Sequence, residues 1–92
     1  MILIIEDETS LAYFIQKTLQ QEGYKVQIAG TGNSGLELAQ KNLPEIVLLD
    51  IKLPDINGLD VLSKLKNIYK NLHIIMITAS ADLQTVIKAM KF

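Results

Sequence analysis

Short apolar runs and helix-like stripes alternate along the whole chain. Four segments have the length and apolar content of strands, at residues 2–5, 24–29, 45–50 and 73–78. Between and after them, apolar residues recur at helical spacing, at positions 11, 14, 15, 18 and 19, then 36, 39 and 43, then 59, 62 and 65, then 83, 86, 87 and 90. The segment 24–29 alternates with period two, which predicts one less buried face and a place near the edge of a sheet.

The expected element boundaries follow from capping and turn residues. Thr9 or Ser10 is the expected N-cap of the first helix, and Gly23 the residue that ends it. Residues 30–35, "GTGNSG", predict a turn, and Asn42 and Pro44 are expected to end the second helix. The fourth helix is predicted to run to the last residue of the chain.

Strict alternation of apolar strands and helices predicts a parallel sheet with helices on its faces. We therefore expect one domain over residues 1–92, with a doubly wound α/β fold built from four β-α units. Ligands of such sheets bind beyond the carboxyl ends of the strands, near the point where the strand order reverses. Glu6, Asp7, Asp50 and Thr78 all stand at such strand ends.

Charge and composition narrow the function classes. Nine basic residues against ten acidic ones give a net charge of -1 without a Lys/Arg cluster, so this segment is not expected to bind nucleic acid directly. The absence of cysteine excludes thiolate zinc sites and Cys nucleophiles and weakly favours a reducing cytoplasm. No apolar run approaches the roughly 20 residues of a membrane span. The sequence predicts a cytoplasmic protein.

Each candidate residue also has a purely structural explanation. Glu6, Asp7 and Glu8 precede a helix, whose positive end favours carboxylates. Asp50 could form an Asx-type turn, and Thr78 could be an ordinary β-branched strand residue. Three strands nevertheless deliver these groups to the same end of one sheet, which favours a common site.

Converging carboxylates repel one another unless a cation lies between them. A site of oxygen ligands without His or Cys suits Mg²⁺ better than zinc. Such an ion would also shield an incoming phosphoryl group. Asp50, at the end of the third strand, is then the expected carboxylate nucleophile, which would become an acyl phosphate.

The chain resembles the receiver domain of two-component response regulators. The resemblance spans Met1 to Phe92 and is carried by "ILIIEDE", "PEIVLLDIKLPDINGLDVL" and "IIMITAS", in the order and spacing of that family. It implies that a sensor histidine kinase donates the phosphoryl group, that Mg²⁺ is required, and that the chain is a signalling receiver rather than an enzyme, with self-catalysed transfer and slow autodephosphorylation.

The resemblance also implies a role for each matching residue. Asp50 matches the phosphoacceptor, Asp7 a direct metal ligand and Glu6 an acid that holds the metal through water. Lys52 matches the position whose backbone carbonyl completes the metal site. Thr78 matches the hydroxyl that moves onto the phosphate, and Ala79 matches a small residue that keeps the site open. The loop leading into the third helix is matched by Pro54 and Gly58.

The resemblance is incomplete at the carboxyl end. The family's fifth strand, its phosphate-contacting lysine, the aromatic switch residue and the last helix have no counterpart, so we expect a piece of a longer chain. Lys88 and Lys91 lie on or after the fourth helix and do not fill the missing role. The fourth strand would then be an exposed edge, and a homodimer or domain-swapped oligomer is one expected consequence. In the parent protein, the family often attaches a DNA-binding output domain.

Two other functions compete with this one. A phosphohydrolase with an Asp nucleophile would be expected to carry a second Asp two residues later, where this chain has Lys52. An interaction or assembly module that does not accept phosphate is the other alternative, because the family's lysine is missing. The only histidine, His73, is expected to be solvated and without a chemical role.

Overall fold

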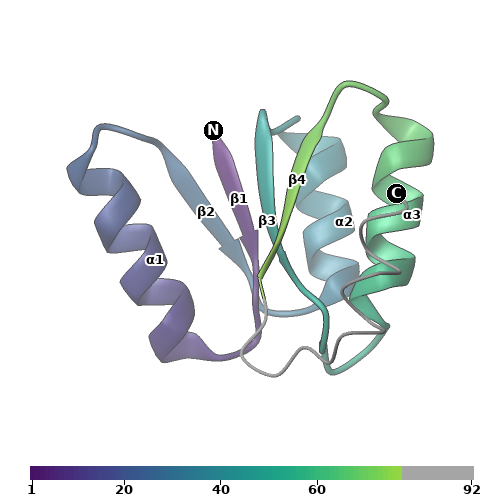
Figure 1. Ribbon diagram of the computed structural model, residues 1–92, viewed down its shortest axis with the longest axis horizontal. Coiled ribbons are helices and arrows are strands. Elements are labelled where there is room, and N and C mark those ends of the chain that lie inside the picture. Colours follow the sequence, from purple (N-terminus) through teal and green to yellow (C-terminus); the bar gives the residue numbers. More distant parts are fainter. Residues whose placement is uncertain (78–92) are drawn as a thin grey trace.

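The computed structural model describes residues 1–77 as a four-stranded parallel sheet with helices on both faces (Figure 1). Three β-α pairs and a last strand follow one another along the chain: β1 (Ile2–Ile5), α1 (Thr9–Gln21), β2 (Val26–Ala29), α2 (Gly32–Lys41), β3 (Ile46–Asp50), α3 (Gly58–Ile68) and β4 (His73–Ile77). The predicted fourth helix, and the end of the fourth strand at Thr78, lie outside the described residues. No helix within residues 1–77 is long and apolar enough to cross a membrane.

The strand order is β2-β1-β3-β4, with every neighbouring pair parallel. The chain first moves from β1 outward to β2 and then returns to the other side of β1, so the order reverses between β1 and β3. This is the predicted doubly wound topology. It also confirms that the second strand is an edge strand.

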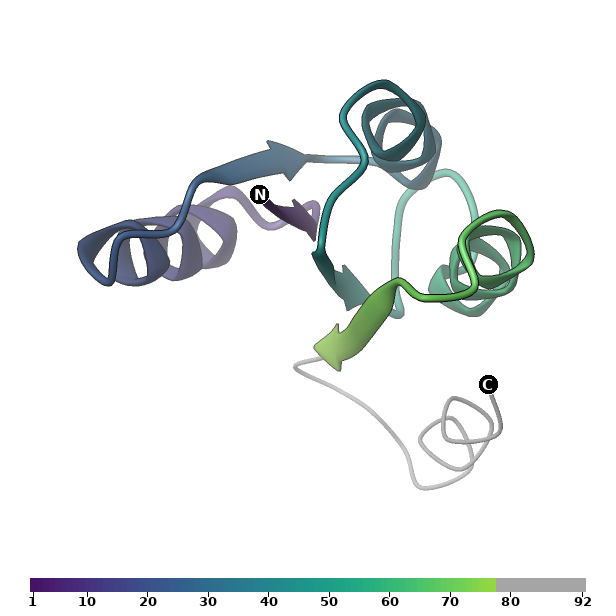
Figure 2. The ribbon, with the colours of Figure 1, turned by 90° about the horizontal axis from the view of Figure 1, so that it is seen from above.

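Two apolar clusters cover the two faces of the sheet. Leu3, Ile5, Val47 and Leu49 form one cluster with buried residues of α2 and α3, and the alternate residues of β1 form the other with Ala12 of α1. Figure 2 shows α1 on one side of the sheet and α2 and α3 on the other. Full burial of β1 explains why its sequence is apolar without alternation.

The start of the first helix differs from the prediction. Glu8, not Thr9 or Ser10, is the N-cap residue, and its side chain makes no capping hydrogen bond. The Glu8 carbonyl accepts the first helical bond, from Ala12 N at 3.0 Å, so Thr9 is already helical. The end is as predicted, since Gly23 has a φ of 93° and its N–H donates to Gln20.

The buried stripe of α1 is rotated from the predicted one. Ala12 is buried and Ile15 and Leu19 pack against it, but Phe14 is 69% exposed. Thr18, also in the predicted stripe, is exposed and its hydroxyl donates to the Phe14 carbonyl. Because the side chain of Ala12 is small, α1 can approach the sheet closely at this position.

The predicted turn at residues 30–35 is instead the first turn of α2. Thr31 caps the helix: its hydroxyl accepts from Ser34 N at 3.0 Å, while Ser34 Oγ accepts from Thr31 N at 3.2 Å. Gly32 and Gly35 are buried, and a Cβ on Gly35 would lie 2.5 Å from Ile5 Cδ1. These glycines allow close packing rather than a turn.

Two further boundaries also shift. The second strand begins at Val26, because Tyr24 N still donates to Leu19 at the end of α1. Asn42 is the C-cap of α2 as predicted, so Leu43 lies beyond the helix and is 62% exposed instead of contributing to its apolar face.

Candidate functional site

The structure brings three of the predicted acids together at the carboxyl end of the sheet. Glu6 and Asp7 follow β1 and Asp50 ends β3, and one carboxylate oxygen from each lies within 4.8 Å of the others. Glu6 is 4% exposed and Asp50 8%, whereas Asp7 is exposed. The carboxylates of Glu6 and Asp50 are thus buried, and that of Asp7 faces solvent.

The register of the sheet explains this convergence. Ile5 of β1 pairs with Leu49 of β3, so Glu6 and Asp50 stand at the same level. Glu6 N donates to Ala29 O at 3.0 Å, which continues the ladder toward β2. Because side chains alternate along a strand, Glu6 and Asp50 lie on the face of Ile4 and Leu48, against α1.

The cluster has an unfavourable charge balance. Burial, together with the neighbouring Asp50 side chain, raises the pKa of the Glu6 carboxyl to about 7. Within residues 1–77, no lysine forms an ion pair with any of the three acids. The cluster therefore favours either a shared proton or a bound cation, and its oxygen-only ligands fit a hard divalent ion.

Helix capping explains little of why acidic residues occupy positions 6–8. Glu8 occupies the N-cap position without a side-chain bond, and Glu6 Oε2 accepts only from Glu8 N, at 3.3 Å, among the described contacts. The Asx-type contact considered for Asp50 does exist, since Lys52 N donates to Asp50 Oδ1 at 3.3 Å. That bond orients the carboxylate from the loop that follows it.

The loop after Asp50 is closed by Gly58. Its N–H donates to the Ile51 carbonyl at 2.8 Å. A Cβ at Gly58 would lie 2.6 Å from Ile51 Cα and against the Asp50 carbonyl oxygen, so only glycine fits there without moving backbone. The Lys52 side chain is exposed. Thr78 and Ala79, the other predicted site residues, lie outside the described residues.

One residue near the site was not singled out from the sequence. Asp55, in the loop between β3 and α3, accepts hydrogen bonds from Gly32 N and Asn33 N at the start of α2. Its partners stand 23 and 22 residues earlier, so no local pattern connects them. Only the predicted topology, which places both segments at the same end of the sheet, could have suggested the contact.

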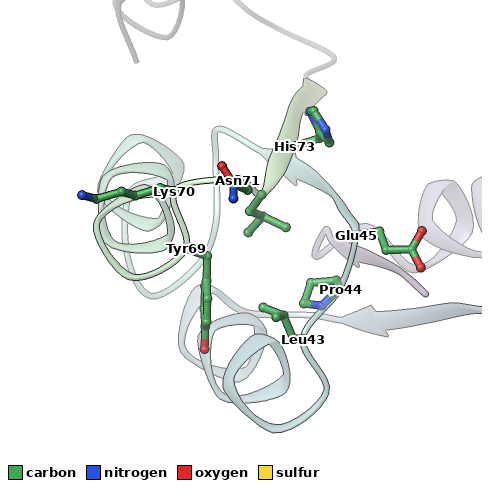
Figure 3. Close-up of a pocket in the computed structure, with 8 residues that line it drawn as sticks. Leu43, Pro44, Glu45, Tyr69, Lys70, Asn71 and His73 are labelled. Carbon is green, nitrogen blue, oxygen red and sulfur yellow. The ribbon is translucent and has the colours of Figure 1, made fainter.

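An apolar cavity lies at the opposite end of the sheet. It has a volume of about 440 Å³ and is lined by residues 43–45, which precede β3, and by residues 69–73, which lead into β4 (Figure 3). Its lining includes the exposed His73, the first residue of β4. In Figure 3 the Lys70 side chain points away from the other lining residues. The cavity holds no acid cluster and is separate from the candidate site.

Comparisons with known proteins agree with this geometry. The chain is 38% identical over 78 residues to the probable transcriptional regulatory protein TcrX of Mycobacterium tuberculosis, covering 85% of this chain and 33% of TcrX. The chain therefore spans about a third of that relative's length.

Two solved structures share the fold. The receiver domain protein (CheY-like) from Methanospirillum hungatei superposes with a TM-score of 0.93 at 33% identity, over 98% of this chain and 72% of that one. A response regulator from Burkholderia pseudomallei, solved with a phosphorylated aspartic acid, calcium ion and citrate, gives 0.91 at 27% identity, over 98% and 53%. Residues 2–92 match the family model of the response regulator receiver domain, so the chain belongs to this family of two-component signalling proteins.

Proposed function

We propose that Asp50 is the phosphoacceptor and takes its phosphoryl group from a phosphohistidine of a sensor histidine kinase. The observation that carries this proposal is the placement of the Asp50 carboxylate at the end of a central strand, buried beside Glu6 and Asp7. The phosphorylated aspartic acid of the Burkholderia pseudomallei relative supports it.

The transfer itself requires little covalent chemistry from the protein. A carboxylate oxygen of Asp50 attacks the phosphorus, the P–N bond of the phosphohistidine breaks, and its electron pair returns to the imidazole. The product is an acyl phosphate on Asp50. The Lys52 N–H holds Asp50 Oδ1, and the rigid β3 backbone fixes the carboxylate for attack.

Glu6, Asp7, Asp50 and the backbone carbonyl of Lys52 would hold Mg²⁺. Their oxygen ligands match the preference of this ion. When bound, Mg²⁺ would neutralise charge on the phosphoryl oxygens. The calcium ion named with the Burkholderia pseudomallei structure is a hard cation of the same charge.

The signal would leave the site through Thr78, whose hydroxyl contacts the phosphate in the active state, with Ala79 keeping the site open. Thr78 follows Ile77 in sequence, and Ile77 pairs with Asp50. An output domain would respond to this change, as the name of the relative, a probable transcriptional regulatory protein, suggests. The receiver thus acts as a switch and not as an enzyme on an external substrate.

Intact-mass spectrometry tests the proposal. The chain is incubated with acetyl phosphate, with and without Mg²⁺, beside Asp50→Asn and the control Asp60→Asn, which changes an exposed acid of α3. One Mg²⁺-dependent phosphoryl adduct is expected on the wild type and on Asp60→Asn, and none on Asp50→Asn.

An adduct that persists on Asp50→Asn would contradict the assignment. No adduct on a demonstrably folded chain would contradict acceptance by this chain and favour the assembly module instead. For that function the relevant surface would be β4, where Ile75 is 52% exposed at the edge of the described sheet.

A further inference from the structure

The loop between β3 and α3 is fastened to the N-terminus of α2 by one side chain. Asp55 Oδ1 accepts from Gly32 N and Oδ2 from Asn33 N, each at 2.8 Å. These N–H groups belong to the first turn of α2, where the helix offers no partner of its own. The carboxylate therefore binds two helix donors at once, with one oxygen each.

The charge of Asp55 suits this position. The first turn of α2 contains no acidic residue of its own, so the negative charge that favours a helix N-terminus comes from the distant loop. The hydrogen bond from Asn33 N contributes most to lowering the pKa of the Asp55 carboxyl, and the bond from Gly32 N lowers it further. Asp55 is consequently a specific electrostatic partner of α2.

The same loop makes a second contact with α2 beside the first. Ile56 packs on Gly32, where an added Cβ would lie 2.9 Å from Ile56 Cδ1 and 3.0 Å from Val61 Cγ2. The loop itself borders a cavity of about 490 Å³, lined by residues 51–53, 55–57 and 59. Leu53 and Ile56 of the loop also pack against the core, so the bonds of Asp55 are the polar part of the loop's attachment.

We propose that Asp55 is a positioning residue for the phosphoacceptor site, acting through the backbone of Lys52. The inference rests on the proposed function. Asp55 holds the loop at α2, Gly58 closes it onto Ile51, and between these attachments Lys52 donates its N–H to Asp50 Oδ1. Loss of Asp55 would remove one attachment of the segment that orients the acceptor carboxylate and carries the Lys52 carbonyl.

The test separates positioning from simple helix stabilisation. Asp55→Ala removes a cap of α2 that comes from the loop. Thr31→Ala removes the capping box of the same helix end and leaves the loop attached, so it is the matched control. Circular dichroism verifies that both variants are folded. Amide hydrogen exchange by NMR is then measured at Lys52 and Gly58, first without Mg²⁺, followed by a Mg²⁺ titration.

We expect Asp55→Ala alone to accelerate exchange at Lys52 and Gly58 and to raise the Kd for Mg²⁺ about tenfold, as loss of a supporting contact does at metal sites. Asp55→Asn retains one carbonyl oxygen and should give an intermediate Kd. Equal changes in Thr31→Ala, or unchanged exchange and Kd in Asp55→Ala, would overturn the proposal.

Failure of the proposed function gives a different result. A wild-type chain that binds no Mg²⁺ and accepts no phosphoryl group would contradict the function of the site. The exchange rates without Mg²⁺ would still decide whether Asp55 positions the Asp50 loop, since faster exchange in Asp55→Ala supports that role and unchanged exchange refutes it.

Discussion

The N–H of Gly58 donates to the carbonyl oxygen of Ile51 over 2.8 Å, and this bond closes the loop that follows Asp50. Asn57 then caps α3 by accepting from Leu59 N, also at 2.8 Å. The chain thus leaves β3, passes around the loop and enters α3 within a few residues. The carboxylate of Asp50 therefore stands directly before a tight return of the chain.

Gly58→Ala should disturb the loop and lower the free energy of unfolding by about 1–3 kcal/mol, because the added Cβ meets backbone atoms that cannot rotate away. Gly30→Ala is the control, since a Cβ there meets nothing within 4 Å and should cost less than about 0.5 kcal/mol. Urea unfolding measures both. Equal stability of the two variants would refute the close approach at Gly58.

Stability should depend on pH through Glu6. The pKa of its carboxyl is about 7 in the folded protein and 4.5 by its ordinary value, so between these values the folded state binds more protons. The free energy of unfolding should therefore fall as pH rises from 4.5 through 7, and Glu6 should contribute at most roughly 3 kcal/mol to this fall.

Urea unfolding at pH 5 and pH 8 isolates that contribution by comparing the wild type with Glu6→Gln. The variant should lose the Glu6 part of the pH dependence, while Glu37→Gln, on an exposed position of α2, should behave as the wild type. Identical pH profiles for wild type and Glu6→Gln would show that burial of Glu6 carries no such cost.

Mg²⁺ should raise the melting temperature of the chain, because a ligand that binds only the folded state stabilises it by roughly 1.4 kcal/mol at ten times its Kd. Asp7→Asn should weaken this effect, since Asp7 supplies the exposed carboxylate of the cluster. Thermal unfolding with added Mg²⁺, and again with excess chelator, measures the shift. The same shift in wild type and Asp7→Asn would argue that the ion binds elsewhere.

The observed rotation of α1 predicts different responses at neighbouring positions. Phe14→Ser should change stability by less than about 0.5 kcal/mol, because the ring is 69% exposed. Ala12→Leu should cost about 1–3 kcal/mol, since Ala12 is 1% exposed against the sheet. Chemical denaturation compares the two variants. A large loss of stability in Phe14→Ser would instead support the buried stripe predicted from the sequence.

The sequence predicted the parts of the molecule that depend on strand ends. Apolar runs interrupted by Glu6 and Asp50 were sufficient to place both acids at one edge, because parallel strands share the direction of their carboxyl ends. The start of α2 was missed because Gly32 and Gly35 were interpreted as turn residues, whereas Thr31 and Ser34 carried a capping pattern. The role of Phe14 was missed because helical spacing shows which residues share a face but not which face meets the sheet.

The acid cluster joins residues that stand far apart in the chain. Glu6 and Asp7 are synthesised early, Asp50 only after β2 and α2, and they meet when β3 docks beside β1. An unfolded or partly folded chain therefore has isolated carboxylates with no tendency to gather a cation. Under the proposed function, acceptance of a phosphoryl group would consequently require the completed fold, in which β3 lies beside β1.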